Sequence, residues 1–338
     1  MAERKIDKFI LFMIFSLSII LCLIFLSLFV GRFYVSPNEV ISVLTSKLLS
    51  SSVEEISTTV VWEIRFPRLL LAILVGAGLA ASGAAFQGCF YNPLVSPDIL
   101  GVSSGAGFGA SLGILLTGVS TGVTSILAFA FGLVSVLLSW ILSKMRKGAE
   151  MLSLVLSGII VSAVFNALIS LVKLVADTDS LLPAITFWLM GSFSGATIET
   201  IKYVAIPIIL GIIALLFLRW RINLLTLGDE EAKSLGTNPG RIRLAVIISA
   251  TVITATSVMA AGVIGWVGLI VPNLCRMIVG DDYRRLLPAS CVVGAIFMLI
   301  VDLVARSLTA AEIPIGILTA LIGAPFFALV YIRGGKAR

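Results

Sequence analysis

The sequence predicts an all-α polytopic membrane protein with ten transmembrane helices, and two observations carry that prediction. Hydrophobic residues make up 59% of the 338 positions. Charged residues make up only 12%, about half the share of a soluble domain. Because one crossing takes about 20 apolar residues, this composition suffices for about ten helices. It excludes a cytosolic enzyme, a nucleic-acid-binding module and a secreted scaffold.

Long uncharged windows locate the ten helices within what we expect to be a single permease domain, residues 1–338. The window 99–143 would be about 68 Å long as one helix, so we divide it near Gly118. The window 244–275 divides at Gly262 and Gly265. The expected spans are 9–30, 66–86, 95–116, 121–143, 151–172, 200–219, 243–263, 267–280, 286–306 and 313–332.

Basic residues set the orientation. With both termini in the cytoplasm, 17 of the 24 Lys and Arg residues lie inside, as the positive-inside rule requires. The first uncharged run, Phe9–Gly31, is too long for a signal-peptide core. We therefore expect a multi-pass protein of the cell membrane whose first segment is retained as the first membrane helix.

The sequence lacks the residues that metal binding, a disulfide framework and ATP hydrolysis would need. The chain has no histidine, and its four cysteines stand singly, so we expect no metal site, no cofactor and no disulfide framework. It also lacks a GxxxxGK[ST] phosphate-binding loop, so ATP hydrolysis would need another subunit. We expect no enzymatic activity and no nucleic-acid partner.

Asp302 is the one acidic residue deep within an expected span. Arg306 follows four residues later on the same helix face, which favours an intrahelical ion pair near the outer surface. The alternative is a coupling-ion site, since acidic residues inside membranes are often functional.

Three connections are longer than turns. The outer loop 31–65 contains an amphipathic stretch at 40–49, and the outer loop 173–199 contains an apolar piece, Leu181–Met190, too short to span. The inner loop 220–242 is charged and predicts a short helix that starts at three acidic residues and stops at Gly236. That helix is either a solvated loop element or a docking element for a soluble partner.

Glycine and other small residues crowd the segments 76–113 and 260–275. They favour close packing between helices. They are equally compatible with a central pathway lined by broken helices, which Pro93, Pro97 and Pro272 would help to interrupt.

Four stretches carry a family resemblance over residues 10–333. They are WEIRFPRLLLA at 62–72 with GAGLAASG at 76–83; Gln87-Gly88 with NPLVSPDILGVSSG at 92–105; the loop 228–236; and GWVGLIVPNLCR at 265–276 with GDDYRRLLP at 280–288, PIGILTA at 314–320 and GAPFF at 323–327. Together they resemble the FecCD-type permeases, the membrane subunits of ABC importers for iron–siderophores, haem, vitamin B12 and, in some members, molybdate or tungstate.

The resemblance implies the type II ABC importer architecture. It implies a homodimer that works with two ABC ATPase subunits and with a periplasmic or lipid-anchored substrate-binding protein. It places the ATPase-docking site in the loop 220–242. It also implies a site where the binding protein docks and a gate at the cytoplasmic face. The docking residues would be Gly228, Asp229, Glu230, Glu231, Ala232, Leu235 and Gly236 for the ATPase, and Arg65, Arg68 and Arg306 for the binding protein. The gate would comprise Asn92, Leu94, Met151 and Leu152, the last two in a loop that begins near Ala149.

Two departures and two alternatives accompany this resemblance. Asn273 and Tyr283 stand where the family often has histidine, and neither identifies the substrate. The three arginines would otherwise extend to lipid headgroups. A secondary transporter with inverted repeats is the competing function, whereas no ring of like charges or repeated filter sequence favours a channel.

The windows 69–97, 99–143 and 244–275 lack Asp, Glu, Lys and Arg, which predicts a largely uncharged path.

Overall fold

The computed structural model describes residues 2–31, 33–49, 55–118, 121–145, 150–309 and 311–334, and these contain helices but no strands. The helices are α1 (Ala2–Phe29), α2 (Pro37–Leu49), α3 (Glu55–Thr58), η1 (Thr59–Arg65), α4 (Phe66–Cys89), η2 (Pro97–Leu100), α5 (Val102–Thr117), α6 (Thr121–Met145), α7 (Glu150–Val175), α8 (Leu181–Met190), α9 (Ile198–Leu225), α10 (Asp229–Ser234), α11 (Pro239–Ala261), α12 (Val267–Val279), α13 (Tyr283–Ser307) and α14 (Ile315–Gly334).

Each of the ten expected spans contains a helix, but the described helices differ in length. Seven of them are long and apolar enough to cross a membrane: those that include α1, α4, α6, α7, α9, α11 and α13. The apolar helices α5 and α12 are shorter, with 16 and 13 residues, so ten crossings stay a prediction. The piece Leu181–Met190 forms the short helix α8 within the bounds expected for it.

The start of the second span was predicted too late. A continuous helical segment runs from Ile56 to Cys89, and residues Thr59–Arg65 within it form a π-helix. Its last turn brings the Phe66 N–H to the Val61 carbonyl, five residues earlier. Pro67 follows immediately and has no N–H to donate, so the wider turn lets the chain pass the proline without ending the helix.

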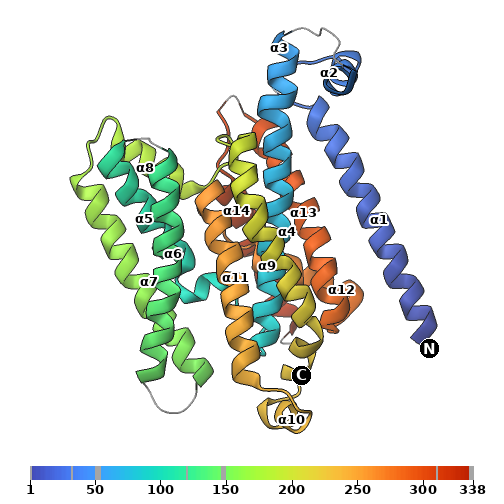
Figure 1. Cartoon of the computed structure of the whole chain (residues 1–338), viewed down its shortest axis with the longest axis vertical. Coiled ribbons are helices and arrows are strands. Elements are labelled where there is room, and N and C mark those ends of the chain that lie inside the picture. The colour runs from blue at the N-terminus through green and yellow to red at the C-terminus, as the bar shows by residue number, and fades with distance from the viewer. Residues whose placement is uncertain are drawn as a thin grey trace.

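Helix α4 lies at the centre of the bundle, in contact with α9, α11, α12 and α13 (Figure 1). In its apolar window 78% of residues are buried, against 6% for α1. A Cβ at Gly83 would overlap the Gly268 carbonyl on α12, and one at Gly76 would overlap the Gly294 carbonyl on α13. The glycines therefore serve close packing, the first of the two readings of the small-residue segments.

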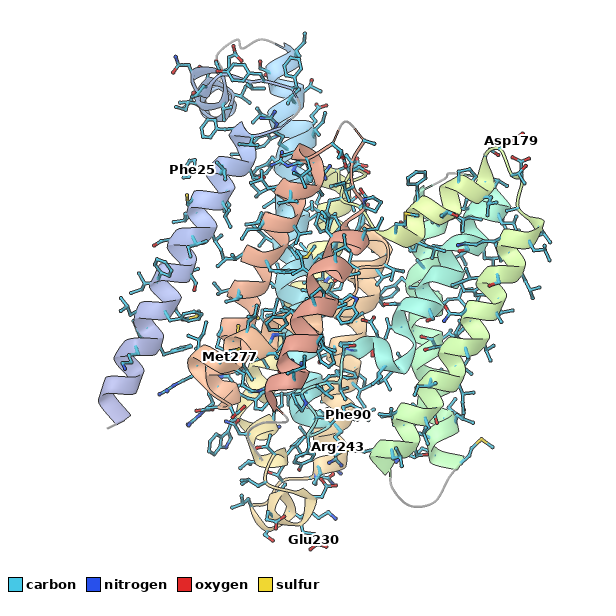
Figure 2. The ribbon with its side chains drawn as sticks, turned by 180° about the vertical axis from the view of Figure 1, so that it is seen from behind. Phe25, Phe90, Asp179, Glu230, Arg243 and Met277 are labelled. Carbon is cyan, nitrogen blue, oxygen red and sulfur yellow. The ribbon has the colours of Figure 1, made fainter. Side chains whose placement is uncertain are left out.

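The other helices surround this centre unevenly. Helices α5, α6, α7 and α8 form a lateral group that meets the centre through α11 (Figure 1). Helix α1 lies on the opposite flank, and Phe25 points away from the bundle, as expected for a side chain in contact with lipid (Figure 2).

Broken segments also meet inside the bundle, as the second reading proposed. Helix α11 ends at Ala261, and α12 begins at Val267 after Gly262 and Trp266, both with positive φ. The Ser192 N–H donates to the Ala261 carbonyl at 2.8 Å. This hydrogen bond joins the non-helical segment after α8 to the end of α11.

The bundle has two distinct ends. Helices α2 and α3 form one, here called the α2 end, and α10 projects from the other, the α10 end (Figure 1). The start of α1 also lies toward the α10 end (Figure 1).

Candidate functional site

The α10 end carries the short helix that the charged inner loop predicts. Asp229, Glu230 and Glu231 occupy its first turn, where negative charge stabilises the helix dipole. Gly236 has φ +75°, and the Thr237 N–H donates to the Ala232 carbonyl at 3.0 Å. Glycine stops the helix because this left-handed conformation costs it little.

An ion pair and one buried side chain fasten α10 to α11. The Arg243 guanidinium donates to both carboxylate oxygens of Asp229, at 2.8 and 2.5 Å, and Ala232 is fully buried. These hydrogen bonds hold the pKa of Asp229 below its usual range, so the carboxylate is charged at neutral pH. Leu235 is 58% exposed. Thus α10 has one side fixed to the bundle and an apolar residue facing outward.

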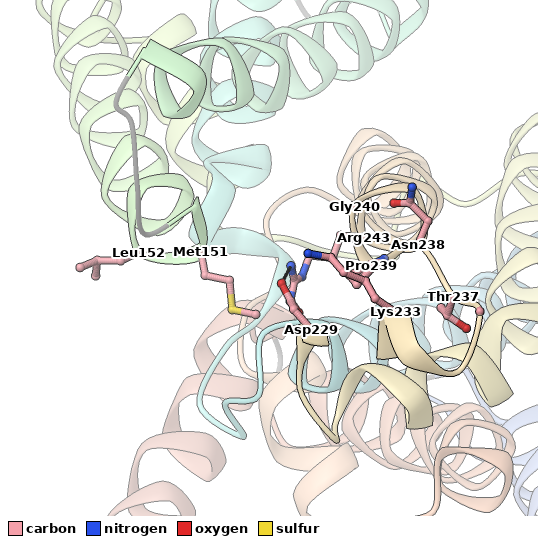
Figure 3. Close-up of a pocket in the computed structure, with 10 residues that line it drawn as sticks. Met151, Leu152, Asp229, Lys233, Thr237, Asn238, Pro239, Gly240 and Arg243 are labelled. Carbon is pink, nitrogen blue, oxygen red and sulfur yellow. Dashed lines mark hydrogen bonds and ion pairs between the residues drawn. The ribbon is translucent and has the colours of Figure 1, made fainter. Parts of the chain in front are cut away.

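A cavity of about 960 Å³ lies between this loop and the start of α7. Met151 and Leu152 line it from α7, and Asp229, Lys233 and Arg243 line it from the loop and α11. Met151 points toward Asp229 and Arg243, whereas Leu152 points away (Figure 3). The structure therefore brings two of the expected gate residues beside the expected docking loop. Ala149 lies outside the described residues.

The other two gate residues lie in the turn after α4. The Leu94 N–H donates to the Asn92 side-chain oxygen at 2.9 Å, which closes a tight turn, and Leu94 is partly exposed. The turn is held from α12 by Asn273, whose amide donates to the Pro93 carbonyl at 3.1 Å. Glu230 lies at the tip of the α10 end (Figure 2).

A polar network that the sequence did not reveal continues from this turn. Arg276 donates to the Gln87 and Asn273 side-chain oxygens at 2.9 and 2.7 Å and pairs with Asp281 at 2.8 Å. Asn273 acts here as a link between α12 and the turn. No sequence pattern pairs Arg276 with Gln87, because the two residues lie 189 positions apart.

The loop before α13 is joined to the end of α9. The Asn223 amide donates to Asp282 at 2.6 Å, and its oxygen accepts from the Tyr283 N–H at 2.8 Å. Partial burial opposes ionisation of Asp282, but hydrogen bonds from Arg284 and Asn223 lower its pKa to about 2. The carboxylate therefore caps α13 in its charged form at neutral pH.

The α2 end holds the three arginines, and each is buried instead of facing outward. Arg65 donates to carbonyls at the end of α1, those of Leu28 and Phe29, at 2.5 and 3.1 Å. Arg306 donates to the Ser27 carbonyl and hydroxyl, both at 2.7 Å. Because these partners lie within the chain, the alternative in which the arginines extend to lipid headgroups is wrong.

Asp302 is the centre of this cluster. The expected pair with Arg306 is present at 3.4 Å, but a shorter one, of 2.6 Å, joins Asp302 to Arg68 on α4. Arg68 also donates to both carboxylate oxygens of Glu312 at 2.9 Å. Asp302 is 1% exposed, whereas Glu312 is 31% exposed. In the described residues, no group of three His, Cys, Asp or Glu side chains could hold a metal ion.

Comparison with known proteins identifies the family of the chain. The FecCD transport family profile matches residues 19–333. The chain belongs to the FecCD transport family. It is 44% identical to the molybdate import system permease protein MolB of Haemophilus influenzae, over 92% of this chain and 93% of that protein. It is 38% identical to the Fe(3+)-citrate import system permease protein YfmE of Bacillus subtilis, over 99% and 98%.

A solved relative supports the same conclusion. It is described as an inward-facing conformation of a metal-chelate type ABC transporter and is 41% identical, with a TM-score of 0.84 over 94% of this chain and 97% of that one. This FecCD protein is therefore a multi-pass protein of the cell membrane in a family of transport permease subunits. Membership in this family favours an ABC permease over the secondary-transporter alternative.

The buried cluster generates a stability prediction. Asp302→Asn leaves Arg68 and Arg306 without their buried counter-charge, and breaking a buried pair on one side costs about 3–5 kcal/mol. We expect a matching loss in the free energy of unfolding in detergent. Asp281→Asn is the control, because Asp281 is 83% exposed and its pair with Arg276 is worth at most about 1 kcal/mol. Equal losses for the two variants would contradict the assignment.

Proposed function

We propose that this protein is the membrane-spanning subunit of a binding-protein-dependent ABC importer. It moves a metal chelate (iron–siderophore, haem or corrinoid) or a molybdate-type oxyanion into the cytoplasm through ten crossings, with the α10 end cytoplasmic. The observation that carries this proposal is the placement of α10. It projects from the bundle and is fixed by Asp229–Arg243 beside a cavity that Met151 lines.

The α10 helix suits insertion into a groove of an ATPase. Its bundle side is already paired through Asp229 and buried through Ala232, whereas Leu235 and Leu227 are exposed. Apolar side chains on a short projecting helix are the usual anchors for a groove in a partner. Since the chain has no phosphate-binding loop of its own, the ATPase would supply the energy.

A homodimer explains how two ATPase copies would bind. Two-fold symmetry would place one α10 helix from each protomer on the same membrane face. Each helix would then engage one ATPase, so that closure of the ATPase pair moves both protomers together.

The uncharged windows favour a path that releases its cargo. Segments 69–97, 99–143 and 244–275 contribute no charged side chain, so a chelate or oxyanion would meet no strong counter-charge there. Conduction requires binding weak enough for exit. Specificity would then lie mainly in the binding protein.

The direct test of this function is uptake. The protein, reconstituted in vesicles with its cognate ATPase and binding protein, should accumulate one substrate class from a panel of ferric siderophore, ferric citrate, haem, cobalamin and molybdate. Accumulation should require both ATP and the binding protein. Uptake driven by an ion gradient without the ATPase would contradict the proposal and restore the secondary-transporter alternative.

The docking role of α10 gives a second prediction. Leu235→Ser removes an exposed anchor without altering the paired side of the helix, so we expect at least tenfold weaker ATPase association and unchanged permease stability. Leu308→Ser is a matched control, because Leu308 is similarly exposed, follows α13 and lies at the α2 end. Gly236 is unsuitable for this test, since its positive φ makes any substitution strained. Normal association of the Leu235 variant would remove α10 from the docking surface.

Docking of the binding protein through Arg65, Arg68 and Arg306 stays a prediction, and the structure identifies what would oppose it. A partner carboxylate that approaches Arg68 would compete with Glu312, which already accepts two hydrogen bonds. Glu312→Gln weakens this internal competitor and leaves Asp302 in place. We expect binding-protein affinity to rise about threefold or more, with a stronger dependence on ionic strength. Unchanged affinity would show that Arg68 does not take part in docking.

A further inference from the structure

Helix α4 ends in an unusual way. The Asn92 N–H donates to the Gln87 carbonyl at 3.2 Å and the Phe90 N–H to the Phe86 carbonyl at 2.9 Å, and Tyr91 has φ +52°. The bond that spans five residues and the left-handed residue after the cap define a Schellman ending. Glycine is the usual residue at that position, because any side chain strains the backbone there. Here the position holds a tyrosine.

The side chain of Tyr91 makes a contact that glycine could not. Its hydroxyl oxygen accepts a hydrogen bond from the Gly228 N–H at 3.0 Å, across 137 positions of sequence. Gly228 is the residue directly before α10, where no side chain caps the helix. The hydroxyl therefore joins the end of α4 to the start of the expected docking helix.

A second connection between the same two places runs through α11. Arg243 of α11 holds Asp229 of α10 in an ion pair, and α11 packs against α4. Since the Tyr91 hydroxyl joins the end of α4 directly to the start of α10, a displaced α10 either carries that end with it or breaks this hydrogen bond.

The residues after Tyr91 are the turn that holds Asn92 and Leu94. The Pro93 carbonyl of that turn accepts from Asn273 on α12, so the turn lies between α10 on one side and α12 on the other. Strained conformations persist where the surroundings hold them, and they often mark elements that switch.

We infer that Tyr91 is a positioning residue that transmits the displacement of α10 to the turn 91–95. The inference rests on the proposed function and adds to it the residue through which partner binding reaches the gate. The hydroxyl does this through one directional hydrogen bond. The turn that follows is held by the Leu94–Asn92 and Asn273–Pro93 hydrogen bonds.

Two substitutions separate this role from that of a structural helix cap. Tyr91→Phe keeps the ring and removes only the hydroxyl. Tyr91→Gly removes the side chain and relieves the left-handed backbone, so the protein should unfold at an equal or higher temperature than wild type. Tyr203→Phe, at an exposed position on α9, is the matched control.

The measurement is the amount of substrate imported per ATP hydrolysed by the complete transporter in vesicles, together with thermal stability and ATPase association. We expect both Tyr91 variants to import at least threefold less substrate per ATP, with ATPase association within twofold of wild type. The loss in Tyr91→Gly should occur without loss of stability, which a purely structural role would not produce.

Two results would overturn the inference, and they are distinguishable from failure of the proposed function. Wild-type import per ATP in both variants contradicts the role of Tyr91 alone, as does a loss that only follows thermal stability. Absence of ATP-dependent uptake by the wild-type transporter contradicts the proposed function itself, and the inference with it.

Discussion

Backbone contact between α4 and its neighbours is the constraint on which the rest of the structure depends. Gly83 and Gly76 allow α12 and α13 to approach until carbonyl groups occupy the space that a Cβ would need. Within lipid there is little hydrophobic gain from association, so helices are held by packing and by hydrogen bonds. The central position of α4 follows from these small residues, and the α2 end and the α10 end both make contacts with its termini.

The two termini of α4 make different kinds of polar contact. At the α2 end, Arg68 is buried with Asp302, and the carboxylate balances charge that the bilayer could not solvate. At the α10 end, the Tyr91 hydroxyl accepts a hydrogen bond from Gly228, in the loop that projects from the bundle. One continuous helix thus joins the face expected to meet a binding protein with the face expected to meet an ATPase.

Sequence reasoning succeeded where the determinant is local. Uncharged length located a helix in every expected span, and the acidic start and Gly236 stop predicted α10. It failed at the start of the second span, expected at residue 66, because a π-helix at Thr59–Arg65 carries the helix through this point. The resemblance implied that Arg65, Arg68 and Arg306 meet a partner, whereas all three are buried and bonded within the chain.

What the sequence determined by itself was the membrane class, the order of the helices and the family, since these depend on composition and on contiguous motifs. Only the tertiary structure decided the partners of the polar side chains. Arg68 lies 234 positions from Asp302, and Tyr91 lies 137 positions from Gly228. A hydrogen bond depends on the position of two atoms within a few tenths of an ångström. That precision comes from how the helices pack, and no periodicity within one segment encodes it.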